Sequence, residues 1–444
     1  MASCTSLSLL LFIVLFTSFH PSLQENTLHL SFPLTSVPLS ETSASKARYI
    51  SSLLAKKGGA GAASAEGSSP PFGYNYQSSF KYSMALIVSL PIGTPPQAQQ
   101  MVVDTGSQLS WIQCHRKSPE KQPPPASFDP SLSSSFSVLP CNHPLCKPRI
   151  PDFTLPTTCD QKRLCHYSYF YADGTLAEGN LVREKFTFST SQTTPPLILG
   201  CAAESAEAEG ILGMNLGRLS FISQAKVPKF SYCVPPRQGG RGDTSGRFHL
   251  GENPNSRTFQ YINLLTFPQS QRTPNFDPLA YTVGLAGIKI GGKKLNISVA
   301  AFRPDATGSG QTLIDSGTQY TFLVDAAYGK VREEVVRLVG PKMKKGYVYG
   351  GSLDMCFDGN AIEIGRSIGD MALEFEKGVE ILIKKERVLD EVGGGVHCVA
   401  IGRSESLGVA SNIIGNFHQQ DLWVEFDIKN RQIGFGVADC TKSV

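Results

Sequence analysis

Two short segments of the sequence carry the same pattern around an aspartate. The first is VVDTGSQLSWI around Asp104, and the second is LIDSGTQYTFL around Asp315. In each segment two apolar residues precede the aspartate, and a hydroxyl residue, a glycine, a second hydroxyl residue and a glutamine follow it. One Asp-hydroxyl-Gly triplet predicts no more than a surface turn, but two such triplets after apolar strands indicate a working pair of carboxylates.

A carboxylate pair would supply acid–base chemistry. Two carboxyl groups a few ångströms apart cannot both ionise easily, so the pair holds one shared proton and offers one acid and one base. The backbone must bring both side chains together, and glycine permits that close approach. Gly106 and Gly317 stand at the required positions. We therefore expect general acid–base catalysis by Asp104 and Asp315.

The hydroxyl residues beside the two aspartates are expected to hold the pair in place. Thr105 and Ser316 directly follow the aspartates and are placed to brace the two loops against each other. Ser107 and Thr318 follow two positions later and are placed to hydrogen-bond the outer carboxylate oxygens. Such hydrogen bonds would keep the two carboxyl groups coplanar.

The elements that must position the pair are strands, and they occur in the same order twice. Each aspartate ends a strand that is preceded by a glycine turn and another strand. An apolar pair followed by glycine comes later in each half, 109 residues after Asp104 at Gly213 and 100 residues after Asp315 at Gly415. Matching motifs at matching distances predict two homologous lobes related by a pseudo-twofold axis, where the aspartates could meet.

Bulk composition agrees with a two-lobed, mainly β protein. The chain has 444 residues, of which 41% are hydrophobic and 18% charged, and this length suggests two domains or lobes. Its 42 glycines and 29 prolines favour strands and turns. We place an N-terminal lobe at 81–265 and a C-terminal lobe at 266–444. The net charge of +4 without a basic stripe argues against nucleic acid as a partner.

The N-terminal region predicts export. The apolar run from Leu7 to Phe16 is too short to span a bilayer but suits a signal peptide, which we place at residues 1–24. Residues 25–80 are rich in Ser, Ala and Gly and are expected to form a propeptide or flexible N-terminal arm. We expect no membrane span after signal removal, entry into the secretory pathway, and use of the glycosylation sequon at Asn296.

Ten cysteines remain outside the signal segment, an even number that permits five disulfides in an oxidising compartment. Half of them fall in segment 114–165, which is expected to be a disulfide-stapled insertion. The spacing of these cysteines is wrong for a common zinc site, so we expect no metal and no cofactor. The ten are Cys114, Cys141, Cys146, Cys159, Cys165, Cys201, Cys233, Cys356, Cys398 and Cys440.

The duplicated aspartate motifs, with GILG and IIGN behind them, resemble the pepsin-like aspartic proteases over about residues 80–440. Asp104 and Asp315 match the catalytic dyad of that family. The resemblance implies a mainly all-β, bilobal acid-protease fold with a central cleft. It further implies acid-favoured hydrolysis of peptide bonds by water activated between the aspartates. The implied partners are peptide or protein substrates and pepstatin-type inhibitors, and the implied state is a monomer.

The same resemblance assigns a substrate-covering flap. Tyr171 in YADGTLAEG matches the flap tyrosine, and Trp111 matches the tryptophan to which that tyrosine hydrogen-bonds. Asp173 and Gly174 belong to the same flap motif. Ala172 departs from the glycine usual at this position, which removes backbone freedom at the flap tip.

The cysteine-rich insertion, FSYC at Cys233 and DMCF at Cys356 narrow the resemblance to the plant nepenthesin- or nucellin-like branch. That branch implies a disulfide between Cys356 and Cys398, and the other pairings stay open. It also implies a role in plant cell survival or development. The location expected from the N-terminal segment is extracellular or in the endoplasmic reticulum, with the vacuole as an alternative.

Other function classes fit the residues less well. A two-carboxylate glycosidase needs no symmetrical Asp-hydroxyl-Gly turns. A serine or cysteine hydrolase is disfavoured further, and the cysteines are better explained as disulfides. The main alternative is a catalytically weak pepsin-like binding or inhibitor protein, because a fold can keep its shape after losing its chemistry.

Overall fold

The structure is a computed structural model that describes residues 76–82, 85–115, 127–147, 157–171, 176–205, 209–237, 244–267 and 273–441. All of these fall within one compact unit of the chain. The expected signal peptide at 1–24 lies outside the described residues, and so do Asp173 and Gly174 of the flap motif. No helix in the described ranges combines the length and hydrophobicity that a membrane span needs.

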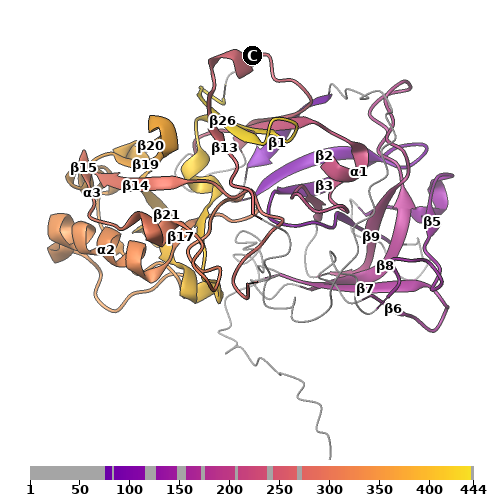
Figure 1. Ribbon diagram of the computed structural model, residues 1–444, viewed down its shortest axis with the longest axis horizontal. Coiled ribbons are helices and arrows are strands. Elements are labelled where there is room, and N and C mark those ends of the chain that lie inside the picture. The colour runs from indigo at the N-terminus through magenta and orange to yellow at the C-terminus, as the bar shows by residue number, and fades with distance from the viewer. Residues whose placement is uncertain are drawn as a thin grey trace, which may run out of the picture. The chain divides into compact units, whose positions relative to one another are not determined.

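One large sheet contains strands from both halves of the chain (Figure 1). Its members are β1 (Tyr76–Tyr82), β2 (Leu86–Ile92), β3 (Gln97–Asp104), β4 (Trp111–Gln113), β5 (Ser137–Val138), β6 (Thr157–Cys159), β7 (Cys165–Phe170), β8 (Leu176–Glu184), β9 (Leu197–Ser205), β10 (Gly210–Gly213), β11 (Lys229–Val234), β12 (Thr244–Leu250), β13 (Gln260–Asn263), β25 (Leu422–Asp427) and β26 (Gln432–Val437). The strand order is β13-β26-β25-β11-β12-β1-β2-β3-β10-β4-β9-β8-β7-β6, with β5 beside β8.

Three smaller sheets and helices α2 and α3 belong to the second half of the described chain, whereas the short helix α1 belongs to the first half. The first sheet has β14 (Leu285–Ile290), β15 (Lys293–Lys294), β19 (Met371–Phe375) and β20 (Glu380–Ile383). The second has β16 (Thr312–Ile314), β17 (Thr321–Leu323), β23 (Ile401–Arg403) and β24 (Asn412–Ile414), and the third has β18 (Cys356–Asp358), β21 (Leu389–Gly393) and β22 (Val396–Val399). The helices are α1 (Phe221–Ala225), α2 (Asp325–Val339) and α3 (Ala361–Ile368). The expected fold class, all-β with two lobes, is confirmed.

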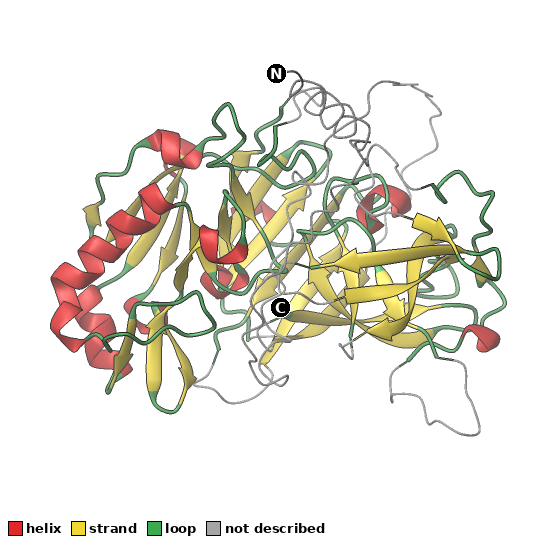
Figure 2. Ribbon diagram, turned by 90° about the horizontal axis from the view of Figure 1, so that it is seen from below, coloured by secondary structure: helices red, strands yellow, loops and turns green. Residues whose placement is uncertain are grey.

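Helix α2 lies on the outer side of the second half (Figure 2). Its buried residues recur at helical spacing, for example Ala327, Val331 and Val335, and they share a core cluster with α3 and β14. Asp325 in the first turn and Arg337 in the last turn complement the helix dipole. The helix therefore forms because an apolar stripe can be buried against the sheet.

The two halves of the chain are joined through the large sheet. Strand β11 of the first half pairs antiparallel with β25 of the second half, and Phe230 stacks on Phe426 with ring centroids 4.6 Å apart. A disulfide between Cys233 and Cys440 closes the same junction. The shared strands and the disulfide hold the lobes as one folded body.

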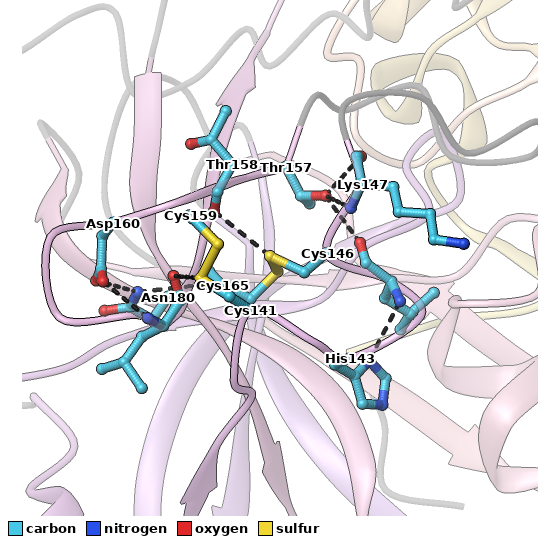
Figure 3. Close-up of a disulfide and its surroundings, with 12 residues drawn as sticks. Cys141, His143, Cys146, Lys147, Thr157, Thr158, Cys159, Asp160, Cys165 and Asn180 are labelled. Atoms are coloured by element: carbon cyan, nitrogen blue, oxygen red, sulfur yellow. Dashed lines mark hydrogen bonds between the residues drawn. A yellow bond between two sulfur atoms is a disulfide. The ribbon is translucent and has the colours of Figure 1, made fainter.

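All ten cysteines outside the expected signal segment form disulfides, including the pair Cys356–Cys398. The other pairs are Cys114–Cys201, Cys141–Cys159, Cys146–Cys165 and Cys233–Cys440. Figure 3 shows two of them side by side at the β6–β7 hairpin, where the sulfurs of Cys141, Cys146 and Cys159 lie within 4.8 Å of one another. As disulfide sulfurs, these atoms are not the thiolates that zinc requires.

Strand β1 begins earlier than the sequence suggested. It starts at Tyr76, inside the segment 25–80 that we expected to be a propeptide or flexible arm, and pairs with β12 from Tyr76 opposite Leu250 to Tyr82 opposite Thr244. The segment YQSSFKY contains no aliphatic residue, and its backbone pairs with β12 on one side and with β2 on the other, which makes it a strand. The folded part of the chain therefore includes residues 76–80.

Candidate active site

The two aspartate segments occupy equivalent places in two copies of one strand arrangement. Asp104 ends β3, which pairs in parallel with β10 so that Gly213 lies opposite Asp104. Asp315 directly follows β16, which pairs in parallel with β24, and its backbone N–H donates to the Ile414 carbonyl at 3.1 Å. Each aspartate is thus fixed at the carboxyl end of a buried strand.

The strands that follow the aspartates repeat the arrangement. Trp111 of β4 lies opposite Ile211 of β10, and Phe322 of β17 lies opposite Ile413 of β24, both in antiparallel pairs. Each of these strands has a parallel partner on its other side, β9 for β4 and β23 for β17. Phe322 therefore takes the place in the second half that Trp111 takes in the first.

Reciprocal hydrogen bonds join the two aspartate loops. The Thr105 N–H donates to Ser316 Oγ at 3.0 Å, and the Ser316 N–H donates to Thr105 Oγ1 at 2.9 Å. Ser316 Oγ donates in turn to the Val103 carbonyl at 2.7 Å, and Thr105 Oγ1 to the Ile314 carbonyl at 3.3 Å. Because every bond is buried and crosses between the halves, the two hydroxyls brace the loops against each other.

The carboxyl groups themselves are buried and face each other's loops. Asp104 and Asp315 are 1% and 2% exposed. Asp104 Oδ1 accepts from the Gly106 N–H at 2.8 Å, while Asp315 accepts from the Gly317 N–H at 3.0 Å and from Thr318 Oγ1 at 2.7 Å. A Cβ atom added to Gly317 would lie 2.2 Å from Asp104 Oδ1, so only glycine lets the carboxyl group of one loop pack on the other.

Ser107 does not take the role expected of it. Its hydroxyl is buried and has no hydrogen-bond partner among the described residues, whereas Thr318 does bond to its aspartate. The Ser107 backbone is held in the turn, where its carbonyl accepts from the Asn215 N–H at 3.1 Å. The β-branched Thr318 has few side-chain rotamers, whereas the serine hydroxyl turns more freely and is not fixed on the carboxyl group.

Trp111 and Tyr171 meet beside Asp104. The indole Nε1–H donates to the Tyr171 hydroxyl at 2.6 Å, and Tyr171 packs edge-on against Tyr169 at 4.6 Å. Burial raises the pKa of Tyr171 well above its ordinary value, and nearby Tyr169 and Asp104 act in the same direction. The phenol therefore stays neutral and keeps its proton for a hydrogen bond.

A polar segment lies behind the Asp315 loop; it begins at Asn416, the last residue of the IIGN motif, and its other residues were not anticipated from the sequence. It is the helical turn η10 (Asn416–Gln419), which directly follows Gly415. Asn416 Nδ2 donates to the Ser316 carbonyl at 3.0 Å, and His418 Nδ1 lies 2.7 Å from Thr321 Oγ1. Burial lowers the pKa of His418 to about 3, so the imidazole is neutral across most of the acidic range. The letters NFHQ alone carry no signal for this role.

Two further sequence features can now be placed. Asn296 of the glycosylation sequon is exposed between β15 and the turn Val299–Phe302. The segment Gly365–Gly369 reads GRSIG, which has the Gly-x-Ser-x-Gly spacing of a serine nucleophile motif and was not predicted from the sequence. It lies on α3 and its C-cap, where Ser367 Oγ donates to the Glu363 carbonyl at 2.9 Å. A nucleophilic serine of that motif needs a strand-to-helix turn, so this segment does not form one.

The sequence of each half of the chain matches a described protein family. Residues 86–250 match the family described as "Xylanase inhibitor N-terminal", and residues 280–437 match "Xylanase inhibitor C-terminal". The chain is 38% identical over 390 residues to "Aspartic proteinase PCS1" of Arabidopsis thaliana, covering 82% of this chain and 84% of that protein. It is 32% identical over 363 residues to "Aspartic proteinase nepenthesin-1" of Nepenthes gracilis, covering 80% and 78%.

Solved structures share the fold. The structure titled "Crystal structure of Basic 7S globulin from soybean" aligns with a TM-score of 0.58 at 15% identity, covering 82% of this chain and 98% of that one. The structure titled "Crystal structure of edgp" aligns with a TM-score of 0.57 at 18% identity, covering 83% and 96%. At these identities the likeness concerns the fold alone.

Proposed function

This chain belongs to the pepsin-like aspartic proteinase family, and we propose that it is an aspartic endopeptidase whose catalytic groups are Asp104 and Asp315. The observation that carries the proposal is the reciprocal pair of hydrogen bonds between Thr105 and Ser316. These bonds hold Gly317 against the Asp104 carboxyl group and bring two buried acids to one place.

The chemistry follows from one shared proton. The ionised carboxyl group takes a proton from a water molecule, which attacks the carbonyl carbon of the scissile peptide bond. The protonated carboxyl group donates its proton to the carbonyl oxygen, which gives a tetrahedral diol. The carboxyl group that took the proton from water then passes it to the leaving nitrogen as the carbon–nitrogen bond breaks, and a diol hydroxyl returns a proton to the other carboxylate, which restores the pair. Activity is expected on the acidic side, because the pair must retain one proton.

The surrounding residues have supporting roles in this proposal. Thr105 and Ser316 fix the separation of the loops, and Thr318 orients the Asp315 carboxyl group through its hydroxyl. Tyr171, held by Trp111, would cover a bound substrate together with Asp173 and Gly174 and would exclude water from the reaction. The Ser107 hydroxyl is buried nearby and would be available to a carboxyl oxygen after a rotamer change.

The biological setting is proposed on the same footing. Disulfides among the described residues favour an oxidising compartment. The proposal includes a signal peptide at 1–24 and glycosylation at the exposed Asn296, which suit such a compartment, and separately a propeptide upstream of β1 and two lobes divided between residues 265 and 266. We propose peptide or protein substrates, pepstatin-type inhibitors, and a monomer in the secretory pathway. A role in cell survival or development stays a prediction.

A binding or inhibitor protein is the second candidate, because the matching family descriptions name a xylanase inhibitor. The buried, braced aspartate pair favours catalysis, since binding alone does not require two acids to be held together.

Cleavage of a denatured protein mixture by the secreted, processed protein tests the proposal. We expect cleavage at acidic pH, inhibition by pepstatin, and loss to below about a thousandth of the wild-type rate in Asp104→Asn and in Asp315→Asn. A folded wild type that cleaves nothing over the acidic and neutral range would support the binding protein instead.

A further inference from the structure

The side chains that hold the Asp315 loop reach a buried carboxylate, Asp390, whereas the equivalent residues of the Asp104 loop have other surroundings. Gln319 and Tyr320 are the fourth and fifth residues after Asp315, where the first half has Gln108 and Leu109. The Gln108 side chain accepts a hydrogen bond from the Leu219 N–H at 3.1 Å, within its own half, and Leu109 is a buried apolar residue. The two loops are therefore equivalent in backbone but differ in what holds them from the side.

Asp390 receives the two polar side chains of the second loop. Tyr320 Oη donates to Asp390 Oδ2 at 2.9 Å, and Gln319 Nε2 lies 3.4 Å from the same oxygen. Asp390 lies on β21 opposite Cys398 of β22, and Cys398 is fixed by its disulfide to Cys356. The acceptor is thus part of a rigid sheet and can hold the loop in position.

Arg237 reaches the same carboxylate from the first half of the chain. It follows β11, and its Nη1 donates to Asp390 Oδ2 at 2.6 Å, with side-chain exposures of 18% for Arg237 and 7% for Asp390. The Arg237 backbone N–H donates to Gln420 Oε1 at 2.6 Å, which fixes the start of the side chain. A carboxylate this buried is costly without a partner, and the guanidinium supplies one.

We propose that Asp390, paired with Arg237, is a positioning residue that holds Tyr320 and Gln319 and thereby sets the place of the Asp315 carboxyl group. The backbone of the same segment is held from the opposite side, where the Phe417 N–H donates to the Gln319 carbonyl at 2.9 Å and Gly415 packs against the Tyr320 carbonyl. The loop is clamped on two sides, and the side-chain clamp is the one that titrates. The inference rests on the proposed proteolytic function.

The clamp should respond to acid. Burial raises the pKa of Asp390, while Arg237 and the Tyr320 hydroxyl act in the opposite direction. Tyr320 and Tyr349 also face the cluster: burial raises the pKa of Tyr320 well above its ordinary value, and Asp390 and Tyr349 add to this. Because the folded-state pKa of Asp390 is raised, its protonation at low pH does not destabilise the fold. It removes the charge that holds Arg237, so the loop loses its fixed position while the protein stays folded.

The test compares pH profiles of kcat and KM for Tyr320→Phe and Asp390→Asn with the wild type. We expect kcat to fall about tenfold in both variants with KM little changed, because the loop shift misplaces Asp315 after substrate has bound. In Asp390→Asn the acid limb of the profile should also move to lower pH, since the titrating group is gone. Asp358→Asn is the control, because Asp358 is an exposed carboxylate paired with Lys344 at 2.7 Å on the same half.

The outcomes separate the two hypotheses. If the wild type cleaves and both variants keep its kcat and its acid limb, the positioning role is refuted, whatever their melting temperatures. If Asp390→Asn does not fold, Tyr320→Phe decides alone, since it removes one hydroxyl and leaves the ion pair intact. A wild type without cleavage would refute the proposed function and this inference with it.

Discussion

The contact between Gly317 and Asp104 offers the sharpest test of the site, through the substitution Gly317→Ala. A Cβ atom at position 317 would lie 2.2 Å from Asp104 Oδ1 and 2.6 Å from its Cγ. The carboxyl group cannot simply rotate away, because Oδ1 also accepts the Gly106 N–H at 2.8 Å. The added methyl group must therefore push apart the two loops or displace the Asp104 side chain.

The size of the effect follows from the overlap. An ordinary contact begins at 3.4 Å, so relief of the 2.2 Å approach requires a movement of about 1.2 Å. A misplacement of about 1 Å in a catalytic group can cost about a hundredfold in rate, which corresponds to about 2.7 kcal/mol of transition-state stabilisation. Overpacking at a buried site also lowers the free energy of unfolding by about 1–3 kcal/mol.

The assay is kcat/KM on a fluorogenic peptide at acidic pH, with circular dichroism to verify the fold. The matched control is Gly329→Ala on the exposed face of α2, where an added Cβ atom meets nothing within 4 Å. That change should leave kcat/KM unaltered and stabilise the protein by about 0.5–1 kcal/mol, as alanine does in a helix. A folded Gly317→Ala protein within about threefold of wild-type kcat/KM would refute the close packing of the loops.

Three further predictions concern groups around this site. Trp111→Phe removes the donor to Tyr171 and should lower kcat/KM about tenfold, which steady-state kinetics would measure; an unchanged value would exclude a role for this bond. Burial raises the pKa of Glu425, so the stability contributed by its protonated form is present at acidic pH and is lost as pH rises through that pKa. Glu425→Gln should therefore reduce the drop in Tm between acidic and neutral pH, measured by calorimetry. An identical drop in the variant and the wild type would contradict this. Replacing both Cys233 and Cys440 by Ser should lower the free energy of unfolding by about 2–5 kcal/mol in urea titrations, and no change would show that the junction is held by β-pairing alone.

The carboxylate pair could be predicted because its information is local and occurs twice. Asp104 and Asp315 each follow an apolar strand and precede a glycine, and those short-range rules place a side chain at the end of a buried strand without any knowledge of the rest. The start of the folded part was placed too late, because β1 acquires its strand conformation by pairing with β12, which is distant in sequence. Local alternation is informative only where a strand buries one face.

Residues that act across the fold had no such signal. Arg237 and Asp390 are 153 positions apart, and neither belongs to a motif. His418 looks like any surface histidine in the sequence, although the fold buries it and keeps it neutral. GRSIG shows that a motif can also mislead: it has the spacing of a serine nucleophile motif, but it lies on a helix that cannot present the serine. Spacing indicates chemistry only when the element that carries it has the right geometry.

Asp104 and Asp315 come from equivalent loops but have different surroundings. This difference allows one carboxyl group to act as the acid and the other as the base. Asp104 lies near Tyr171, which directly follows β7 and, in the proposed enzyme, would contact what occupies the site. Asp315 faces Tyr232 of β11, whose hydroxyl donates to Gln419 at 2.6 Å in the core that joins the halves. In the proposed enzyme, the surroundings of Asp104 would change when substrate binds, whereas those of Asp315 belong to the core that joins the halves. A pair that shares one proton needs such inequality, because two identical environments would not distinguish the acid from the base.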